Sequence, residues 1–370
     1  MILFSYCQIE MQLIQHSEET LRAALVSKRQ DLVESYQKYS PGERRLLEEG
    51  FHPDSVLFGP ITLHSESDWI HSHPEPRQDF ADFYRNPYRC TPVKGRNTIY
   101  IQSIGSFGDS EESTQLYVAW LQEYCKAFYY GLAVRLLEPV PVSDTSCAFR
   151  VNTNSHNLQI HAGDLLRYLK KRKPRDAFCI VGITMTDLYP KDSWNFIFGQ
   201  ASLTEGMGIF SFARYDDNFY SSNYKGRLQK TKKLTPGDYS VFSDCYTPPI
   251  TSILLYRSCR TLTHEIGHIF GLKHCQWLRC VMQGSNHLEE SDRRPLDLCP
   301  ICVRKLQSAI GFRIEERYQA ILQWIESGLS SVTSKDTGET ETKPHKPTKA
   351  FEESREWLLK CLSVLEDDLI

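Results

Sequence analysis

The run from His264 to His274 constrains this chain more than any other part of its sequence. It reads HEIGHIFGLKH and matches the pattern HExxHxxGxxH. His264 and His268 lie four residues apart, so a helix would project both imidazoles from one face, near enough to share a zinc ion at about 2.0 to 2.1 Å from each nitrogen. Gly271 would end or bend that helix, because glycine adopts backbone angles that other residues resist, and the chain could then bring His274 to the same metal.

The carboxylate of Glu265 gives this pattern a chemical purpose. Three neutral ligands would leave one position of the zinc ion for water, and Glu265 could take a proton from that water and deliver one to the leaving amine of a peptide. An amphipathic helix with its polar residues in solvent is the alternative. The glycine, the third histidine and the apolar residues 251–263 favour the metal site. The sequence therefore predicts a zinc metallopeptidase with Glu265 as the catalytic base and acid.

A second group of candidate ligands follows at once: Cys275, Cys280, Cys299 and Cys302. Their short spacings suit a closed tetrahedral zinc site, which has no position for water and is therefore structural. A pair of disulfides or unrelated core thiols is the alternative, which the lack of a secretory signal disfavours. Because Cys275 follows His274 directly, we expect the second zinc to anchor the segment that carries the third catalytic ligand. Two zinc ions per chain are predicted.

The combined motif, HExxHxxGxxHCxxxxC followed by Met282 and by the CxxC of residues 299–302, resembles the archaemetzincin family of zinc metalloproteases. The resemblance implies that Met282 forms the Met-turn, an apolar floor beneath the metal, although by itself it would be read as a core methionine. It also implies the role of each residue singled out above: His264, His268 and His274 as ligands of the catalytic zinc, Glu265 as acid and base, and Cys275, Cys280, Cys299 and Cys302 as ligands of the structural zinc.

One departure from the wider metzincin group bears on the mechanism. Some metzincins have a tyrosine after the Met-turn that helps the transition state, whereas residues 283–287 here read QGSNH. The zinc ion could stabilise the oxyanion as a Lewis acid, and Asn286 and His287 are candidates for further hydrogen bonds. An ordinary loop role for both residues is the alternative.

The pattern of apolar residues predicts an α/β fold. Strands are expected at residues 98–105, 133–137 and 177–184, and helices at residues 115–130 and 158–171, and such alternation is typical of a sheet with crossover connections. Together with the resemblance, this predicts a metzincin-like mixed sheet with an antiparallel substrate-binding edge strand, a zinc-binding active-site helix and a C-terminal helical subdomain with the four-cysteine zinc site.

The substrate-binding edge strand is assigned to residues 207–215, just before the expected zinc helix. Extended peptides can bind to the edge of a sheet by adding a further strand, which makes Gly208, Ile209, Phe210 and Ser211 the candidate substrate-binding residues. An ordinary core hairpin is the alternative. The basic, Tyr- and Ser-rich residues 216–249 are expected to line or cover the cleft.

Four regions are predicted along the chain. Residues 1–95 form a helical and irregular extension, in which residues 68–80 (DWIHSHPEPRQDF) are expected to be a solvated loop rather than a metal site through His71 and His73. Residues 96–327 form the catalytic domain, with a final helix at 303–326 interrupted around Gly311. Residues 328–349 are polar without apolar periodicity and predict a flexible linker. Residues 350–370 predict an amphipathic helix that packs on the catalytic domain or binds a protein partner.

Charge and hydropathy exclude several classes of partner. The 43 basic and 46 acidic residues leave a net charge of -3, which does not suggest nucleic acid. No stretch reaches the about 18 to 20 apolar residues of a membrane span, and the opening residues lack a signal peptide, so we expect a cytoplasmic, or also nuclear, protein that is not secreted. The other function considered is a catalytically weak or inactive, zinc-stabilised binding or scaffold protein. The intact Glu265 argues against it, because a scaffold has no chemical use for that carboxylate.

Overall fold

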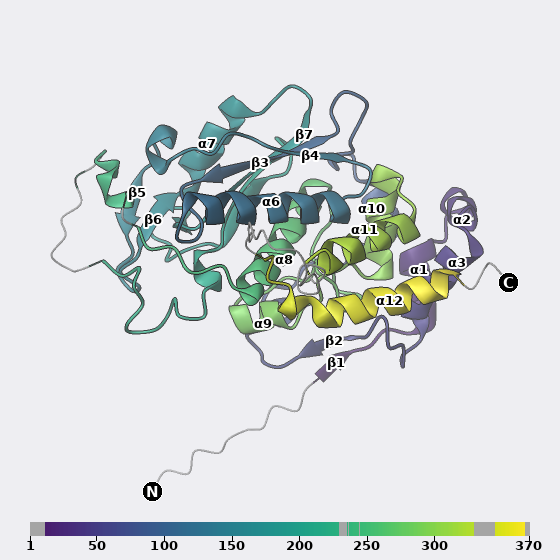
Figure 1. Cartoon of the computed structure of the whole chain (residues 1–370). Coiled ribbons are helices and arrows are strands. Elements are labelled where there is room, and N and C mark those ends of the chain that lie inside the picture. Colours follow the sequence, from purple (N-terminus) through teal and green to yellow (C-terminus); the bar gives the residue numbers. More distant parts are fainter. Residues whose placement is uncertain (1–11, 229–234, 236, 244, 329–344, 367–370) are drawn as a thin grey trace, which may run out of the picture. The chain divides into compact units, whose positions relative to one another are not determined.

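The computed structural model describes residues 12–228, 235, 237–243, 245–328 and 345–366 (Figure 1). The chain forms two compact units, each assembled from segments that are far apart in sequence. The first unit consists of Met1–Asn86, Leu272–Leu306 and Lys360–Ile370, and the second of Pro87–Gly271 and Gln307–Leu359. Most of the predicted linker, residues 329–344, lies outside the described residues.

The second unit is built on a five-stranded sheet with the strand order β4-β3-β7-β10-β9. All neighbouring strands are parallel except β9 and β10, which are antiparallel, so the predicted mixed sheet is confirmed. Every residue of β3 and β7 is buried, as expected for central strands covered on both faces. The strands are β3 (Thr98–Ile104), β4 (Ala133–Leu136), β7 (Ala177–Thr184), β9 (Gly199–Ser202) and β10 (Met207–Ser211).

Helices cover both faces of this sheet. In Figure 1, helix α7 (Ala162–Arg172) lies on one side of the strands, and helices α6 (Glu111–Phe128) and α8 (Ser252–Ile269) lie on the other. Leu165 and Leu169 of α7 share a buried cluster with Ile180 of β7 and Ile209 of β10. The apolar spacing that predicted α7 therefore marks the face that this helix buries against the sheet.

One helix boundary was predicted too early. Residues 158–161 form strand β6 (Leu158–His161), which pairs with β5 (Phe149–Val151) and β8 (Asp187–Tyr189) in a separate three-stranded sheet. Leu158 and Ile160 alternate with Gln159, and this period of two fits a strand. The buried Gln159 amide also donates a hydrogen bond of 2.9 Å to Asp187 on β8. Helix α7 starts only at Ala162.

The assignment of the edge strand to residues 207–215 is wrong. Strand β10 pairs with β7 on one side and with β9 on the other, so the backbones of Gly208, Ile209, Phe210 and Ser211 already have partners in the sheet. All of its residues are buried, which is typical of an interior strand. A Cβ atom on Gly208 would lie 2.3 Å from the Phe210 ring, so the strand is also closely packed. The antiparallel strand at the end of the order is β9.

The last three helices of the chain follow the sequence pattern. Gly311, with a φ of +90°, separates helix α10 (Pro300–Ile310) from α11 (Ile314–Glu326), as the predicted interruption required. The predicted C-terminal helix is present as α12 (Glu352–Glu366). The unit boundary falls within α10 and within α12. Short 3-10 helices are η2 (Val142–Thr145), η3 (Ala213–Tyr215), η4 (Tyr239–Phe242) and η6 (Lys349–Phe351).

The first unit joins the N-terminal helices to residues from the second half of the chain. Arg304 of α10 is fully buried and donates hydrogen bonds to the carbonyl oxygens of Leu25, Val26 (3.0 Å) and Leu32 (2.7 Å). Leu25 and Val26 are the last residues of the first helix, whose end leaves their carbonyl groups without partners within the helix. The other elements are β1 (Gln12–Ile14), α1 (Glu18–Val26), α2 (Gln30–Gln37), α3 (Pro41–Glu48), η1 (Glu49–Phe51), β2 (Ile61–Leu63), α4 (Trp69–Ser72), α5 (Phe80–Arg85) and α9 (Leu288–Asp292).

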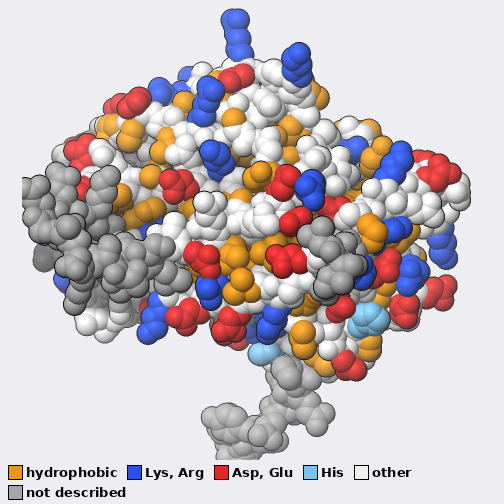
Figure 2. All heavy atoms as spheres, turned by 45° about the vertical axis from the view of Figure 1, so that its right-hand side comes forward, with side chains coloured by type: hydrophobic (Ala, Val, Ile, Leu, Met, Phe, Trp, Pro, Cys, Tyr) orange, Lys and Arg blue, Asp and Glu red, His pale blue; other side chains and the backbone are white. Residues whose placement is uncertain are grey.

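The surface mixes both signs of charge. On the face shown in Figure 2, acidic and basic side chains are interspersed rather than gathered by sign. Within the described residues, no helix has the length and apolar character needed to cross a membrane.

Candidate functional site

Helix α8 carries the first part of the motif. Its start is fixed by Thr251, whose side chain accepts a hydrogen bond from the backbone N–H of Leu254. The residues leading to the motif are largely buried, and His264 is only 6% exposed, whereas Glu265 and His268 are half-buried. The apolar helix thus places one imidazole in the interior of the second unit and leaves the carboxylate and the other imidazole accessible.

The first two histidines are positioned to share an ion. The Nε2 atoms of His264 and His268 lie 3.0 Å apart, and their rings meet at 90° with centroids 4.6 Å apart. Two nitrogens bound to one tetrahedral zinc ion would be separated by about 3.3 Å. The helical spacing predicted from the sequence therefore gives a pair of nitrogens that fits a single zinc ion.

Two buried tyrosines hold the motif end of α8. The Tyr129 hydroxyl donates a hydrogen bond of 2.5 Å to the carbonyl oxygen of Thr263, the residue before His264, and its ring stacks on Phe270. Burial raises the pKa of Tyr129 well above its usual value, so the hydroxyl remains a donor. The Tyr215 hydroxyl lies 2.7 Å from that of Thr261. The contact of either tyrosine with the zinc helix could not be predicted from the sequence, because no local pattern links them to the motif.

The segment around Tyr215 is fixed in turn by a buried ion pair. Arg214 donates to Asp187 through Nε (2.8 Å) and Nη2 (2.7 Å), and the two side chains are only 3% and 1% exposed. On α8, Arg257 donates a hydrogen bond of 2.7 Å to the Tyr215 carbonyl oxygen. The ion pair therefore anchors a segment that contacts the zinc helix through both its backbone and its side chain.

The chain turns after the helix as predicted. Helix α8 ends at Ile269, and Gly271 has a φ of +95°, a conformation that favours glycine. His274 belongs to the first unit, whereas His264 and His268 belong to the second. The three-histidine ligand set therefore remains a prediction.

His274 has close partners within its own unit. Its Nδ1 atom lies 3.1 Å from each carboxylate oxygen of Glu75, and its ring meets that of Trp69 at 70° with centroids 4.8 Å apart. Burial lowers the pKa of His274, although the Glu75 carboxylate acts in the opposite direction. The lowered pKa favours the neutral imidazole that metals require. Most of residues 71–77 are exposed and residues 74–79 have no regular secondary structure, as expected for a solvated loop. The segment departs from that expectation at residues 69–72, which form helix α4, and at Glu75, which contacts His274.

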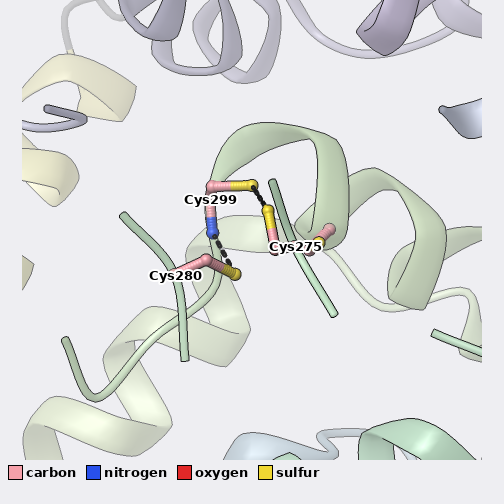
Figure 3. A group of neighbouring side chains, drawn as sticks. Cys275, Cys280 and Cys299 are labelled. Atoms are coloured by element: carbon pink, nitrogen blue, oxygen red, sulfur yellow. Dashed lines mark hydrogen bonds between the residues drawn. The ribbon is translucent and has the colours of Figure 1, made fainter. Parts of the chain in front are cut away.

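The four cysteines of the second motif meet in the first unit. The sulfur atoms of Cys275, Cys280, Cys299 and Cys302 all lie within 4.8 Å of one another, and all four residues are buried. Figure 3 shows the Cys275 and Cys299 sulfurs facing each other, at 3.6 Å. No cysteine in the described part of the chain forms a disulfide. The group has the donor set and the closure of a structural zinc site.

The surroundings of these thiols also fit a cation. The backbone N–H groups of Cys299 and Met282 point to the Cys280 sulfur at 3.3 Å and 3.4 Å, an arrangement that supports a thiolate. Hydrogen bonds from the other three cysteines of the cluster, Cys280 first, lower the pKa of Cys275. Burial raises the pKa of Cys280. Four buried thiolates need a positive charge among them, and a zinc ion would supply it.

The residues after the cysteine pair have structural partners. Met282 is 1% exposed, and its carbonyl oxygen accepts a hydrogen bond of 2.8 Å from the Cys275 N–H. Its Met-turn role remains a prediction. His287 caps helix α9 by accepting from the Glu290 N–H at 3.2 Å, and the Asn286 amide donates to the Ser67 carbonyl oxygen at 2.7 Å. These contacts favour the loop role for Asn286 and His287 over oxyanion stabilisation.

Comparisons with known proteins agree with the motif. A model of peptidase family M54 matches residues 197–308. Archaemetzincin-2 of Homo sapiens is 62% identical over 359 residues, which cover 96% of this chain and 100% of that protein. Archaemetzincin-1 of Homo sapiens is 35% identical over 326 residues, which cover 86% of this chain and 64% of that protein. A crystal structure of archaemetzincin from Methanopyrus kandleri matches with a TM-score of 0.39 and 23% identity, over 60% of this chain and 99% of that one.

The motif and these matches place the chain in the class of zinc-dependent peptidases. The chain belongs to the archaemetzincin family of zinc metallopeptidases. The resemblance found in the sequence is confirmed, and peptides are the substrates that this family implies.

Proposed function

We propose that the chain hydrolyses peptide bonds at a zinc ion held by His264, His268 and His274, with Glu265 as the general base and acid. The observation that carries the proposal is the 3.0 Å separation of the His264 and His268 Nε2 atoms on α8, beside a half-buried carboxylate. His274 would complete the set, as its place in the motif requires. Membership of a zinc metallopeptidase family supports the same reaction.

Each residue of the motif has a separate task. The zinc ion, when bound, polarises the scissile carbonyl and lowers the pKa of water. Glu265 takes a proton from the attacking water and later gives it to the leaving amine, because an amine must be protonated in order to depart. Tyr129 and Tyr215 form hydrogen bonds to the helix that carries Glu265 and so keep the Glu265 carboxylate in a fixed position.

A second, structural zinc ion is proposed at the four cysteines. Cys275 is bonded to His274, and the alpha carbons of consecutive residues lie about 3.8 Å apart. A metal that fixes Cys275 therefore also restricts the backbone of the third catalytic ligand. This gives two zinc ions per chain with different tasks, one for the reaction and one for the position of a ligand.

The substrate is proposed to bind along β9 rather than β10. Strand β9 is antiparallel and lies at the end of the sheet order, so an extended peptide could add to it as a further strand. The residue types give no preference for particular substrate side chains.

The test is mass-spectrometric analysis of cleavage in an unbiased peptide library. We would compare the wild type with Glu265→Ala and Glu265→Gln, at equal zinc content, and use Glu112→Ala as the control, because Glu112 is exposed on α6. Loss of the acid and base should reduce kcat by about 100- to 10,000-fold or more, whereas the control should cleave like the wild type. A zinc-loaded wild type that cleaves no peptide would refute the proposal and favour the scaffold alternative.

A further inference from the structure

The N-terminal residues form the frame of the segment that carries His274. Three hydrogen bonds join the two segments within the first unit: Lys273 N–H to Gln78 Oε1 (3.1 Å), Gln276 Nε2 to the Glu75 carbonyl oxygen (2.8 Å) and Trp277 Nε1 to the Gln78 carbonyl oxygen (2.9 Å). Gln78 is 5% exposed. The chain on both sides of His274 is thus tied, through one backbone N–H before it and two side chains after it, to residues that lie about two hundred positions earlier.

The Glu75 carboxylate determines which imidazole nitrogen of His274 carries the hydrogen. Both of its oxygens lie 3.1 Å from Nδ1, and the two side chains are only 32% and 20% exposed. A hydrogen bond in which the carboxylate oxygens accept places the hydrogen on Nδ1. In the neutral ring, Nε2 then has the free electron pair that a metal needs. The same arrangement of carboxylate, histidine and metal recurs in zinc sites.

The Trp69 ring restricts the rotation of the His274 ring. The two rings meet edge to face at 70°, and the other side of Trp69 stacks on His73 with centroids 4.1 Å apart. Gly284 makes room for the indole, because a Cβ atom there would lie 2.3 Å from it. These residues border a small hollow that lies within the first unit. The imidazole is therefore held by a hydrogen bond at one nitrogen and by an aromatic contact at its face or edge.

We infer that Glu75 is a positioning residue for metal binding, which fixes the tautomer and the orientation of His274 so that Nε2 is presented to the ion. The inference rests on the proposed function in one respect, the role of His274 as a zinc ligand. It gives the N-terminal residues a task that their own sequence did not reveal. Glu75 is not a catalytic residue in this scheme, because it acts only through His274.

The first test is zinc affinity measured by competition with a chelator, on the full chain. The zinc ion that is no longer bound in His264→Ala is the one at the histidine site. Glu75→Ala should lower the affinity for that zinc ion by about 10- to 100-fold. Glu75→Gln should lie between Glu75→Ala and the wild type, because an amide oxygen can still accept the hydrogen bond. The control, Glu66→Gln, removes an exposed carboxylate of the same segment and should bind zinc like the wild type.

The second test reports the tautomer directly. In protein labelled with nitrogen-15 at histidine and loaded only at the cysteine site, His274 should be protonated at Nδ1 in the wild type and should lose that preference in Glu75→Ala. Retention of the cysteine-site zinc shows that the variant is folded, and the isosteric Glu75→Gln serves if the alanine variant is not. Unchanged zinc affinity and an unchanged tautomer in both variants would overturn the inference.

The outcomes also separate the inference from the proposed function. A wild type that binds zinc at the histidines, with the Glu75 effect but without peptide cleavage, would refute the peptidase and leave the positioning role intact. Cleavage that depends on Glu265 together with normal zinc binding in both Glu75 variants would refute the positioning role alone. A wild type without zinc at the histidines would refute both.

Discussion

The buried ion pair of Asp187 and Arg214 provides a quantitative test of how the zinc helix is supported. Asp187→Asn would leave the Arg214 guanidinium buried, at 3% exposure, without its charge partner. Breaking a buried pair on one side typically costs about 3 to 5 kcal/mol. An amide oxygen can still accept one of the two hydrogen bonds from Arg214, so we expect a value near the lower end, about 3 kcal/mol.

The reverse substitution and the double variant sharpen this test. Arg214→Met leaves the Asp187 carboxylate with the Gln159 amide as a donor, and we expect a similar loss. Asp187→Leu combined with Arg214→Met removes both charges at once. Because no uncompensated charge remains, the double variant should be more stable than Arg214→Met.

The assay is urea denaturation of zinc-loaded protein followed by circular dichroism, supported by thermal melting. For a unit of this size, about 3 kcal/mol corresponds to a fall in Tm of roughly 10 °C. The reasoning would be refuted if both single variants stayed within about 1 kcal/mol of the wild type. It would also be refuted if the double variant were no more stable than Arg214→Met.

Two further predictions concern the structural zinc and a buried lysine. Cys302→Ala should lose about one zinc equivalent by elemental analysis and part of the roughly 10 kcal/mol that a structural zinc contributes, whereas Cys361→Ala, a buried thiol outside the cluster, should keep its zinc. Burial lowers the pKa of Lys346 to about 8. The folded state therefore holds fewer protons than the unfolded chain between about pH 8 and pH 10.5, and the wild type should gain about 2 kcal/mol relative to Lys346→Met from about pH 7.5 to pH 10. Urea denaturation of both proteins at the two pH values measures this gain, and an unchanged difference would contradict it.

The parts of the site that could be predicted depend on short spacings. His264 and His268 are one helical turn apart, and the position of Gly271 signals the turn, so local geometry alone was sufficient. The cysteine cluster also follows from spacing, because two close pairs of thiols can meet once the intervening residues fold back. The central strand β7 was predictable because a fully apolar run bounded by polar residues suits a strand buried on both faces.

The parts that could not be predicted depend on long-range pairing. Glu75 and His274 are 199 positions apart, and nothing near Glu75 identifies its partner. The apolar sequence of β10 predicted a strand, but its place between β7 and β9 depends on those strands rather than on its own residues. The boundary at Ala162 was missed because Leu158, Ile160, Ala162 and Leu165 fit both a helix and the end of a strand.

The buried Arg304 has a consequence for the order in which the chain folds during synthesis. The Leu25 carbonyl oxygen that it binds leaves the ribosome 279 residues earlier. At translation rates of about 5 to 20 residues per second, the first helices are made roughly 14 to 56 s before this partner exists. During that interval a polar end of α1 and the apolar face beside Phe80, which Arg304 later covers at 3.7 Å, lack their final contact. The N-terminal helices therefore complete their packing only after residues 264–302, which carry the histidine and cysteine motifs, have been synthesised.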